Sequence, residues 1–69
     1  MERISVSSSN LASIGYEPET ETLEVEFKNG RIYRYLNVPP AIHDALMQAP
    51  SHGIFFNASI KNHFPFERE

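Results

Sequence analysis

The sequence predicts a single α+β domain over residues 1–69, in which a three-stranded antiparallel meander is followed by two short helices packed on one face of the sheet. Three observations predict this fold. Apolar and polar residues alternate between residues 12 and 36, an Asn-Gly pair interrupts the alternation, and a helical spacing of apolar residues begins after residue 38. A chain of 69 residues has room for one modest core, and the absence of cysteine leaves that core without disulfides.

The first expected strand covers residues 12–16, where Ala12, Ile14 and Tyr16 alternate with small residues in the pattern of a half-buried strand. A turn follows at residues 17–20, because Pro18 fixes a backbone angle that suits a turn. The sequence also allows an additional edge strand near the N-terminus, from residue 4 to residue 7.

The next two expected strands cover residues 23–27 and 31–36. Leu23, Val25 and Phe27 alternate with glutamates, as the period of two in a strand requires. The Asn-Gly pair between the two strands is a strong signal for a hairpin turn. These strands therefore continue the meander that the first strand begins.

The register of this hairpin decides which side chains share a face, since a slip of one residue moves every side chain to the other face. A two-residue turn would set Val25 opposite Arg34 and place a charge on the apolar face. A three-residue loop with Gly30 in the left-handed conformation instead sets Val25 opposite Tyr33 and Glu24 opposite Arg34. We predict the second register, because it gathers the aromatic rings on one face and pairs opposite charges on the other.

Two helices are expected after residue 38. The first begins at Pro39-Pro40, with Pro40 tolerated in the first turn, and it ends before Pro50. Ser51 can cap the second helix, which is expected to run until Pro65 with an apolar stripe at Phe56, Ile60 and Phe64. Because adjacent helical residues cannot both face inward, we expect Phe56 in the core and Phe55 at least partly exposed.

The charge balance limits the classes of partner. Six Lys and Arg residues against nine Asp and Glu residues give a formal net charge of -3. Attraction of the whole molecule to a phosphate backbone is therefore absent, and a nucleic-acid role needs a local basic patch. Glutamates gather at residues 17–26, where Glu24 and Glu26 are expected on a solvated sheet face rather than around a metal or a reacting group.

Catalytic and metal-binding patterns are scarce, so we expect a protein that is not an enzyme. The absence of cysteine removes thiol nucleophiles and thiolate metal sites. His43, His52 and His63 lie at spacings that match no metal-ligand motif, and we expect neither a metal nor another cofactor. The sequence begins without the apolar stretch of a secretion signal and holds no apolar run long enough to span a bilayer, so we expect a cytoplasmic protein with no membrane partner.

Aromatic and basic residues are interleaved in the strand of residues 31–36 and again near residue 60. The candidate binding residues in these segments are Arg31, Tyr33, Arg34, Tyr35, Phe55, Lys61 and His63. Interleaving of this kind is typical of proteins that hold single-stranded nucleic acid, because bases stack on aromatic faces while cations contact the phosphates. The alternative is that Tyr33 and Tyr35 are walls of the core, with their hydroxyl groups reaching water.

Four segments together carry a resemblance to a known family. They are residues 8–16, residues 23–27 with Asn29-Gly30, Ser51-His52-Gly53-Ile54-Phe55-Phe56-Asn57 and, above all, Tyr33-Arg34-Tyr35. In order and spacing these segments resemble the KTSC domain, a short domain named for the C-terminus of some lysyl-tRNA synthetases and also found as a free-standing bacterial or phage protein. The resemblance implies RNA binding only as a suggestion drawn from the attachment to synthetases. It supplies no catalytic residues, and it places the family's Tyr-x-Tyr pattern on Tyr33 and Tyr35.

Our first hypothesis is a non-catalytic accessory module that binds RNA or tRNA, with Arg31, Arg34 and Lys61 on the phosphates and Tyr33, Tyr35 or Phe55 against the bases. The alternative class is a protein-interaction module, a bacterial or phage accessory protein in which Phe55 belongs to a patch for a partner or for self-association. A third class is an oligomeric binder of a nucleotide-like anionic ligand. The sequence leaves all three open.

Overall fold

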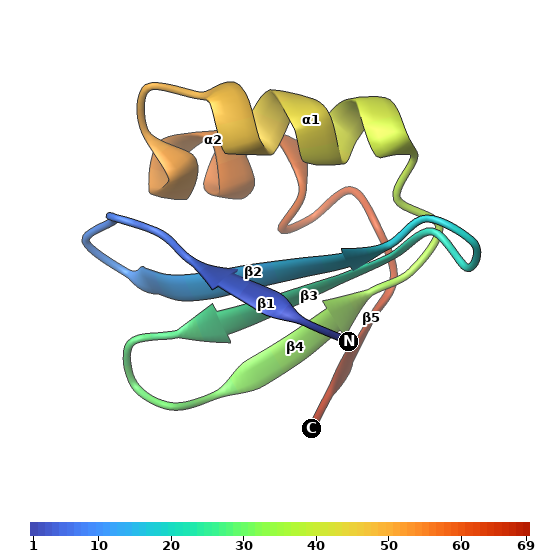
Figure 1. Ribbon diagram of the computed structural model, residues 1–69, viewed down its shortest axis with the longest axis horizontal. Coiled ribbons are helices and arrows are strands. Elements are labelled where there is room, and N and C mark those ends of the chain that lie inside the picture. Colours follow the sequence, from blue (N-terminus) through green and yellow to red (C-terminus); the bar gives the residue numbers. More distant parts are fainter.

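The computed structural model describes residues 1–69 and consists of a five-stranded antiparallel sheet with two helices on one face (Figure 1). The strands are β1 (Arg3–Ser5), β2 (Leu11–Glu17), β3 (Thr22–Phe27), β4 (Ile32–Tyr35) and β5 (Phe66–Arg68), and the helices are α1 (Pro40–Gln48) and α2 (His52–Ser59). The order of strands in the sheet equals their order in the chain. Neither helix has the length and apolar character needed to cross a membrane.

The hairpin of β3 and β4 has the predicted register. Val25 lies opposite Tyr33 and Glu24 lies opposite Arg34, while φ is 90° at Gly30 in the loop. Glycine adopts this positive φ without the strain that a Cβ atom would bring. Tyr33 and Tyr35 consequently face the helices, and Arg34 faces the open side of the sheet.

The core lies between the sheet and the two helices. Leu11 and Ile14 of β2 share the helix-facing side although they are three positions apart, because the pairing of β2 with β3 shifts between Leu11 and Ser13. The buried hydrophobic residues are Leu11, Ile14, Leu23, Val25, Tyr35, Val38, Leu46, Phe56 and Ile60. The sheet and both helices thus share one hydrophobic cluster.

Both helices begin where the sequence predicts. Pro40 takes the first position of α1, where a missing N–H breaks no helical hydrogen bond. The Ser51 side chain caps α2 by accepting a hydrogen bond from the Ile54 backbone N–H at 3.3 Å. Phe56 is buried and Phe55 is half-buried, which confirms the expectation for this adjacent pair.

The prediction that the second helix runs to Pro65 is wrong. α2 ends at Ser59, φ is -120° at Ile60, and turns carry the chain back to the sheet. There the chain adds β5, a strand that we did not expect from the sequence. Its pairing with β4 is flanked by main-chain hydrogen bonds, from the Leu36 N–H to the Pro65 carbonyl oxygen at 2.8 Å and from the Glu69 N–H to the Ile32 carbonyl oxygen at 2.9 Å.

The edge strand that the sequence allowed near the N-terminus is present as β1, although it covers Arg3–Ser5 instead of residues 4–7. It pairs with β2 and places Arg3 opposite Gly15. With β1 and β5 added, the expected three-stranded meander forms the centre of a five-stranded sheet.

The open face of the sheet carries an ion network centred on Glu24. Arg3 Nη1 donates to Glu24 Oε1 at 2.6 Å, and Arg34 Nε donates to Glu24 Oε2 at 3.1 Å. Gly15 lies between Arg3 and Glu24 across the sheet, and a Cβ at Gly15 would come within 2.9 Å of Arg3 Cγ. The expectation that Glu24 is solvated is therefore wrong: it is 5% exposed, because β1 brings a second cation over it.

An aromatic stack connects α1 to the sheet. The rings of Tyr16 in β2 and His43 in α1 are 4.5 Å apart with an interplanar angle of 8°, and the Tyr16 hydroxyl donates to the Val38 carbonyl oxygen at 2.5 Å. Burial lowers the pKa of His43 below its ordinary value of 6.5, and the attraction of the Asp44 carboxylate for the charged ring only partly opposes this shift. The partly buried position of the ring therefore favours the neutral form of His43.

We expect the free energy of unfolding to decrease as the pH falls below 6.5, because the unfolded chain then binds a proton that the folded His43 excludes. This contribution is fully present above pH 6.5 and is lost as the pH falls through the lowered pKa of the folded state. Urea denaturation across this pH range should show the loss in the parent protein and not in His43→Phe, which keeps a ring in the stack. A His63→Asn control should retain the loss, and an undiminished loss in His43→Phe would assign it to another group.

Candidate functional site

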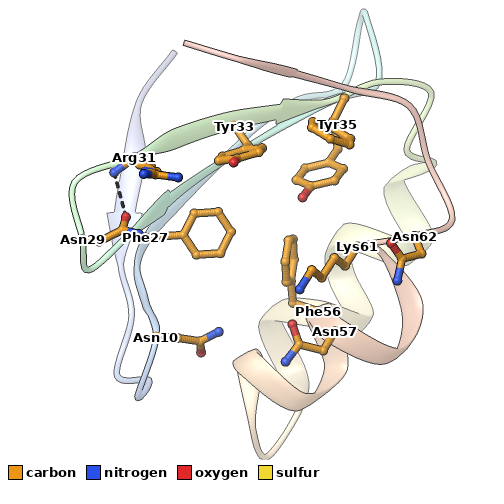
Figure 2. A pocket seen from close by; sticks show the side chains of 11 residues that line it. Asn10, Phe27, Asn29, Arg31, Tyr33, Tyr35, Phe56, Asn57, Lys61 and Asn62 are labelled. Atoms are coloured by element: carbon orange, nitrogen blue, oxygen red, sulfur yellow. Dashed lines mark hydrogen bonds between the residues drawn. The ribbon is translucent and has the colours of Figure 1, made fainter.

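A pocket of about 400 Å³ lies between the helix-facing side of the sheet at β4 and the C-terminal part of α2 (Figure 2). Its volume is within the range of roughly 300–1,000 Å³ that is typical of small-ligand sites. The structure brings four of the sequence-predicted candidates together here, namely Arg31, Tyr33, Tyr35 and Lys61. The remaining lining residues are Asn10, Phe27, Asn29, Phe56, Asn57, Asn62 and Phe66.

Five aromatic rings form the walls of this pocket. Phe56 packs edge-to-face against Tyr35 and against Phe27, with ring centroids 5.3 Å and 5.6 Å apart. Tyr33 and Tyr35 lie nearly parallel at an angle of 19°, and Phe66 of β5 lies 5.4 Å and 5.5 Å from them. Because edge-to-face contacts favour particular ring orientations, the walls are organised before any ligand binds.

The two tyrosines of β4 differ in exposure. Tyr35 is 3% exposed and belongs to the core, whereas Tyr33 is only half-buried. Burial, with a smaller contribution from the neighbouring Tyr33, raises the pKa of Tyr35 above its ordinary 10.0, so that its hydroxyl keeps its proton at neutral pH. That hydroxyl points into the pocket (Figure 2). Tyr35 therefore offers a hydroxyl group to the pocket, and Tyr33 offers part of its ring.

The pocket is basic although the chain as a whole is acidic. Arg31 and Lys61 are exposed, take part in none of the ion pairs of the structure, and share a lining that contains no Asp or Glu. Arg31 reaches the pocket from the hairpin loop, and Lys61 reaches it from the turn after α2 (Figure 2). The two cations therefore form a local positive patch of the kind that a chain with a net charge of -3 needs to bind an anion.

Three of the predicted candidates lie outside the pocket. Arg34 is on the open face of the sheet, where it pairs with Glu24 and where its Nη2 donates to Glu69 Oε1 at 2.5 Å. Phe55 is half-buried against the core, and exposed His63 is not among the lining residues. Arg34 lies on the opposite face of the sheet from Tyr33 and Tyr35, because the period of two in β4 points neighbouring residues to opposite faces.

Phe66 and the four asparagines of the pocket were not predicted as site residues from the sequence. Asn29 was explained by the hairpin turn alone, while Asn10 is far in the chain from Asn57 and Asn62. No spacing or motif in the sequence groups these asparagines. Their amides add hydrogen-bonding groups to a pocket that otherwise offers rings and cations.

A second concavity, of about 410 Å³ between β2 and α1, differs in charge. Its lining includes the carboxylates of Glu2 and Asp44 and contains no Lys or Arg. No group of three or more His, Asp or Glu side chains is arranged to hold a metal ion anywhere in the structure. Of these two concavities, the pocket beside β4 has the charge that suits an anionic ligand.

The fold and the pocket define a small α+β domain in which a helix pair and an antiparallel sheet enclose an aromatic, basic concavity. A family model for the KTSC domain matches residues 7–64, and the chain belongs to the KTSC domain family. The predicted family resemblance is confirmed. The crystal structure of a KTSC domain protein from Yersinia pestis matches with a TM-score of 0.94 and 42% sequence identity, covering 99% of this chain and 96% of that one.

Two relatives show the contexts in which similar sequences occur. An uncharacterized protein of Stutzerimonas stutzeri is 46% identical over 69 residues, covering 99% of this chain and 97% of the relative. A lysine–tRNA ligase of Nostoc punctiforme is 43% identical over 58 residues, which is 84% of this chain but only 10% of the ligase. The chain is therefore related to one small segment of that enzyme and to a protein of its own size.

Proposed function

We propose that this chain is a non-catalytic module that binds single-stranded RNA in the pocket between β4 and α2. The observation that carries the proposal is the lining, which combines five aromatic rings with two cations that form no ion pair and contains no carboxylate. Single-stranded RNA is bound by this combination elsewhere, because bases stack on aromatic faces while cations neutralise the adjacent phosphates. The lining also lacks histidine, serine and carboxylate side chains that would serve as a nucleophile or a general base.

Tyr33 and Phe66 are the rings best placed for stacking in this proposal. Phe66 is 54% exposed and Tyr33 is half-buried, so both retain ring surface that a base can cover. Each stacked base contributes roughly 1–3 kcal/mol to binding. Tyr35 and Phe56 are buried, so their rings support the pocket walls and leave little surface for stacking.

Arg31 and Lys61 are assigned to the phosphates. Both side chains extend into solvent at the pocket and are free of carboxylate partners, so no intramolecular ion pair has to break before RNA binds. The relationship to a segment of a lysine–tRNA ligase, a protein whose name includes an RNA substrate, supports the same class of ligand. The proposed site leaves out Arg34, which pairs with Glu24 on the open face of the sheet. It also leaves out Phe55 and His63, which do not line the pocket.

The test is binding of a labelled single-stranded RNA pool and of tRNA across a salt series. We expect affinity to fall steeply with salt, and the log–log slope to become shallower by about 0.7 for each phosphate interaction removed in Lys61→Gln or Arg31→Gln. Tyr33→Ala should weaken binding with little change in slope, because it removes stacking and not a charge.

Lys28→Gln is the matched control, since Lys28 is exposed and carries the same charge but does not line the pocket. It should retain most of the affinity and slope of the parent protein. Absence of RNA binding at low salt, or equal losses in Lys28→Gln and Lys61→Gln, would refute the proposed function and favour a protein-interaction module.

A further inference from the structure

We propose that the pocket discriminates between bases, and that it prefers bases with a keto oxygen, uracil and guanine, over their amino counterparts, cytosine and adenine. This inference rests on the proposed function and adds a base preference to it. It follows from the orientation of two asparagine amides, each of which has its oxygen occupied by the protein and its nitrogen free.

The first amide belongs to Asn10, in the loop between β1 and β2. The Ser8 Oγ accepts from the backbone N–H groups of Asn10 and Leu11 at 3.4 Å and 3.3 Å, so its own proton is directed elsewhere. That proton is donated to Asn10 Oδ1 at 3.1 Å. Gly53 of α2 lies close against the same oxygen, where a Cβ would collide with it. Asn10 therefore keeps its Oδ1 on the protein side and presents Nδ2, a donor, to the pocket (Figure 2).

The second amide belongs to Asn29, in the hairpin loop. Its Oδ1 accepts a hydrogen bond from the Arg31 backbone N–H at 3.0 Å (Figure 2). A backbone N–H can only donate, so the atom that faces it must be the oxygen and the free atom must be Nδ2. The turn thus fixes a second amide with its donor available to a ligand.

Arg31 and Lys61 also donate and cannot accept. The groups with a fixed role in this pocket are therefore all donors: two amide nitrogens, a guanidinium and an ammonium. Asn57 and Asn62 are exposed and take part in no intramolecular hydrogen bond through their side chains, so they are free to turn either end to a ligand and do not discriminate. The Tyr35 hydroxyl likewise donates or accepts.

A lining dominated by donors matches the keto oxygens of uracil (O4) and guanine (O6). Cytosine and adenine carry an amino group at the same position, which would face another donor and lose a hydrogen bond. Uracil and cytosine have the same size and shape, so stacking and phosphate interactions contribute almost equally to both. The difference between them isolates the hydrogen-bonding preference of the pocket.

The experiment compares oligouridine with oligocytidine of equal length at one salt concentration. We expect oligouridine to bind about fivefold to tenfold more tightly, the factor that corresponds to a single hydrogen bond at a base edge. In Asn29→Asp the turn keeps its acceptor for the Arg31 N–H, while the free donor becomes an acceptor, so the ratio of the two affinities should fall toward one.

Gln48→Glu is the control, because it adds the same negative charge to an exposed position outside the pocket. Its affinities should decrease slightly for both oligonucleotides while their ratio stays that of the parent protein. Equal affinity for the two oligonucleotides in the parent protein, with binding still dependent on Lys61, would overturn the base preference and leave the proposed function standing. A failure of both to bind would instead refute the proposed function.

Discussion

Replacement of Phe56 by alanine is expected to leave much of the protein unfolded at room temperature. Phe56 is 1% exposed and contacts the rings of Tyr35 and Phe27, so the substitution would remove a fully buried ring from the centre of the domain. Changes of this kind cost about 3–5 kcal/mol through lost burial and the cavity left behind. A domain of this length has a total stability on the order of 3–10 kcal/mol, so the loss is comparable with the whole.

Thermal unfolding followed by circular dichroism measures this effect. Phe55→Ala is the matched comparison, since it removes the same ring from the neighbouring helical position, where the side chain is only half-buried. We expect a clearly smaller decrease in melting temperature for Phe55→Ala than for Phe56→Ala. Similar melting temperatures for the two variants would contradict the packing described for α2.

Glu24→Gln is expected to be the most destabilising change on the open face of the sheet. The substitution keeps the shape of the side chain but removes the charge that Arg3 and Arg34 share. Removing one partner of a fully buried ion pair costs about 3–5 kcal/mol, and we expect about 2 kcal/mol here because the arginine side chains are 27% and 39% exposed and remain in contact with water.

Chemical denaturation in urea gives this difference directly. Glu26→Gln is the control on the same strand and the same face, where the carboxylate accepts only from Ser13 Oγ at 2.8 Å and is half-buried. A loss below about 1 kcal/mol is expected for the control. If the two variants lose equal stability, the network around Glu24 contributes nothing beyond an ordinary surface contact.

The hairpin of β3 and β4 shows which part of the fold the sequence determines. Its register follows from residues within one short segment, because the alternation of apolar residues and the need for a positive φ at Gly30 admit one arrangement that separates the rings from the charges. The starts of the helices are equally local, since Pro40 and Ser51 act through their own backbone neighbours. Neighbouring residues in the chain were therefore sufficient to predict the hairpin register and the starts of the helices.

β5 and the burial of Glu24 were not predicted, because both depend on contacts between segments that are distant in the chain. β5 has three residues and is defined by its pairing with β4, which lies some thirty positions earlier in the chain. Glu24 is covered because β1 carries Arg3 across Gly15, again a contact between distant segments. Neither contact leaves a periodic pattern in the sequence. The prediction that Glu24 is solvated and the prediction of a long second helix were therefore both wrong.

The candidate site likewise contains some residues that the sequence predicted and others that only the structure revealed. Tyr33, Tyr35 and Arg31 are close in sequence, and Lys61 was found by its charge, so the sequence was able to nominate them. Their separation from Arg34 follows from strand geometry once the register is known. The pocket also takes Asn10 from the loop before β2, Asn57 from α2, and Asn62 and Phe66 from the chain after α2. Their assembly with the hairpin needed the structure.

Phe66 contributes to the pocket from the edge of the sheet. The family match ends at residue 64, and Phe66 belongs to a strand whose residues are all exposed. One wall of the pocket therefore comes from a segment outside the family-model match and outside the core cluster. Because β5 contributes no buried residue, we expect substitutions in this segment to reshape one wall of the pocket at little cost in stability.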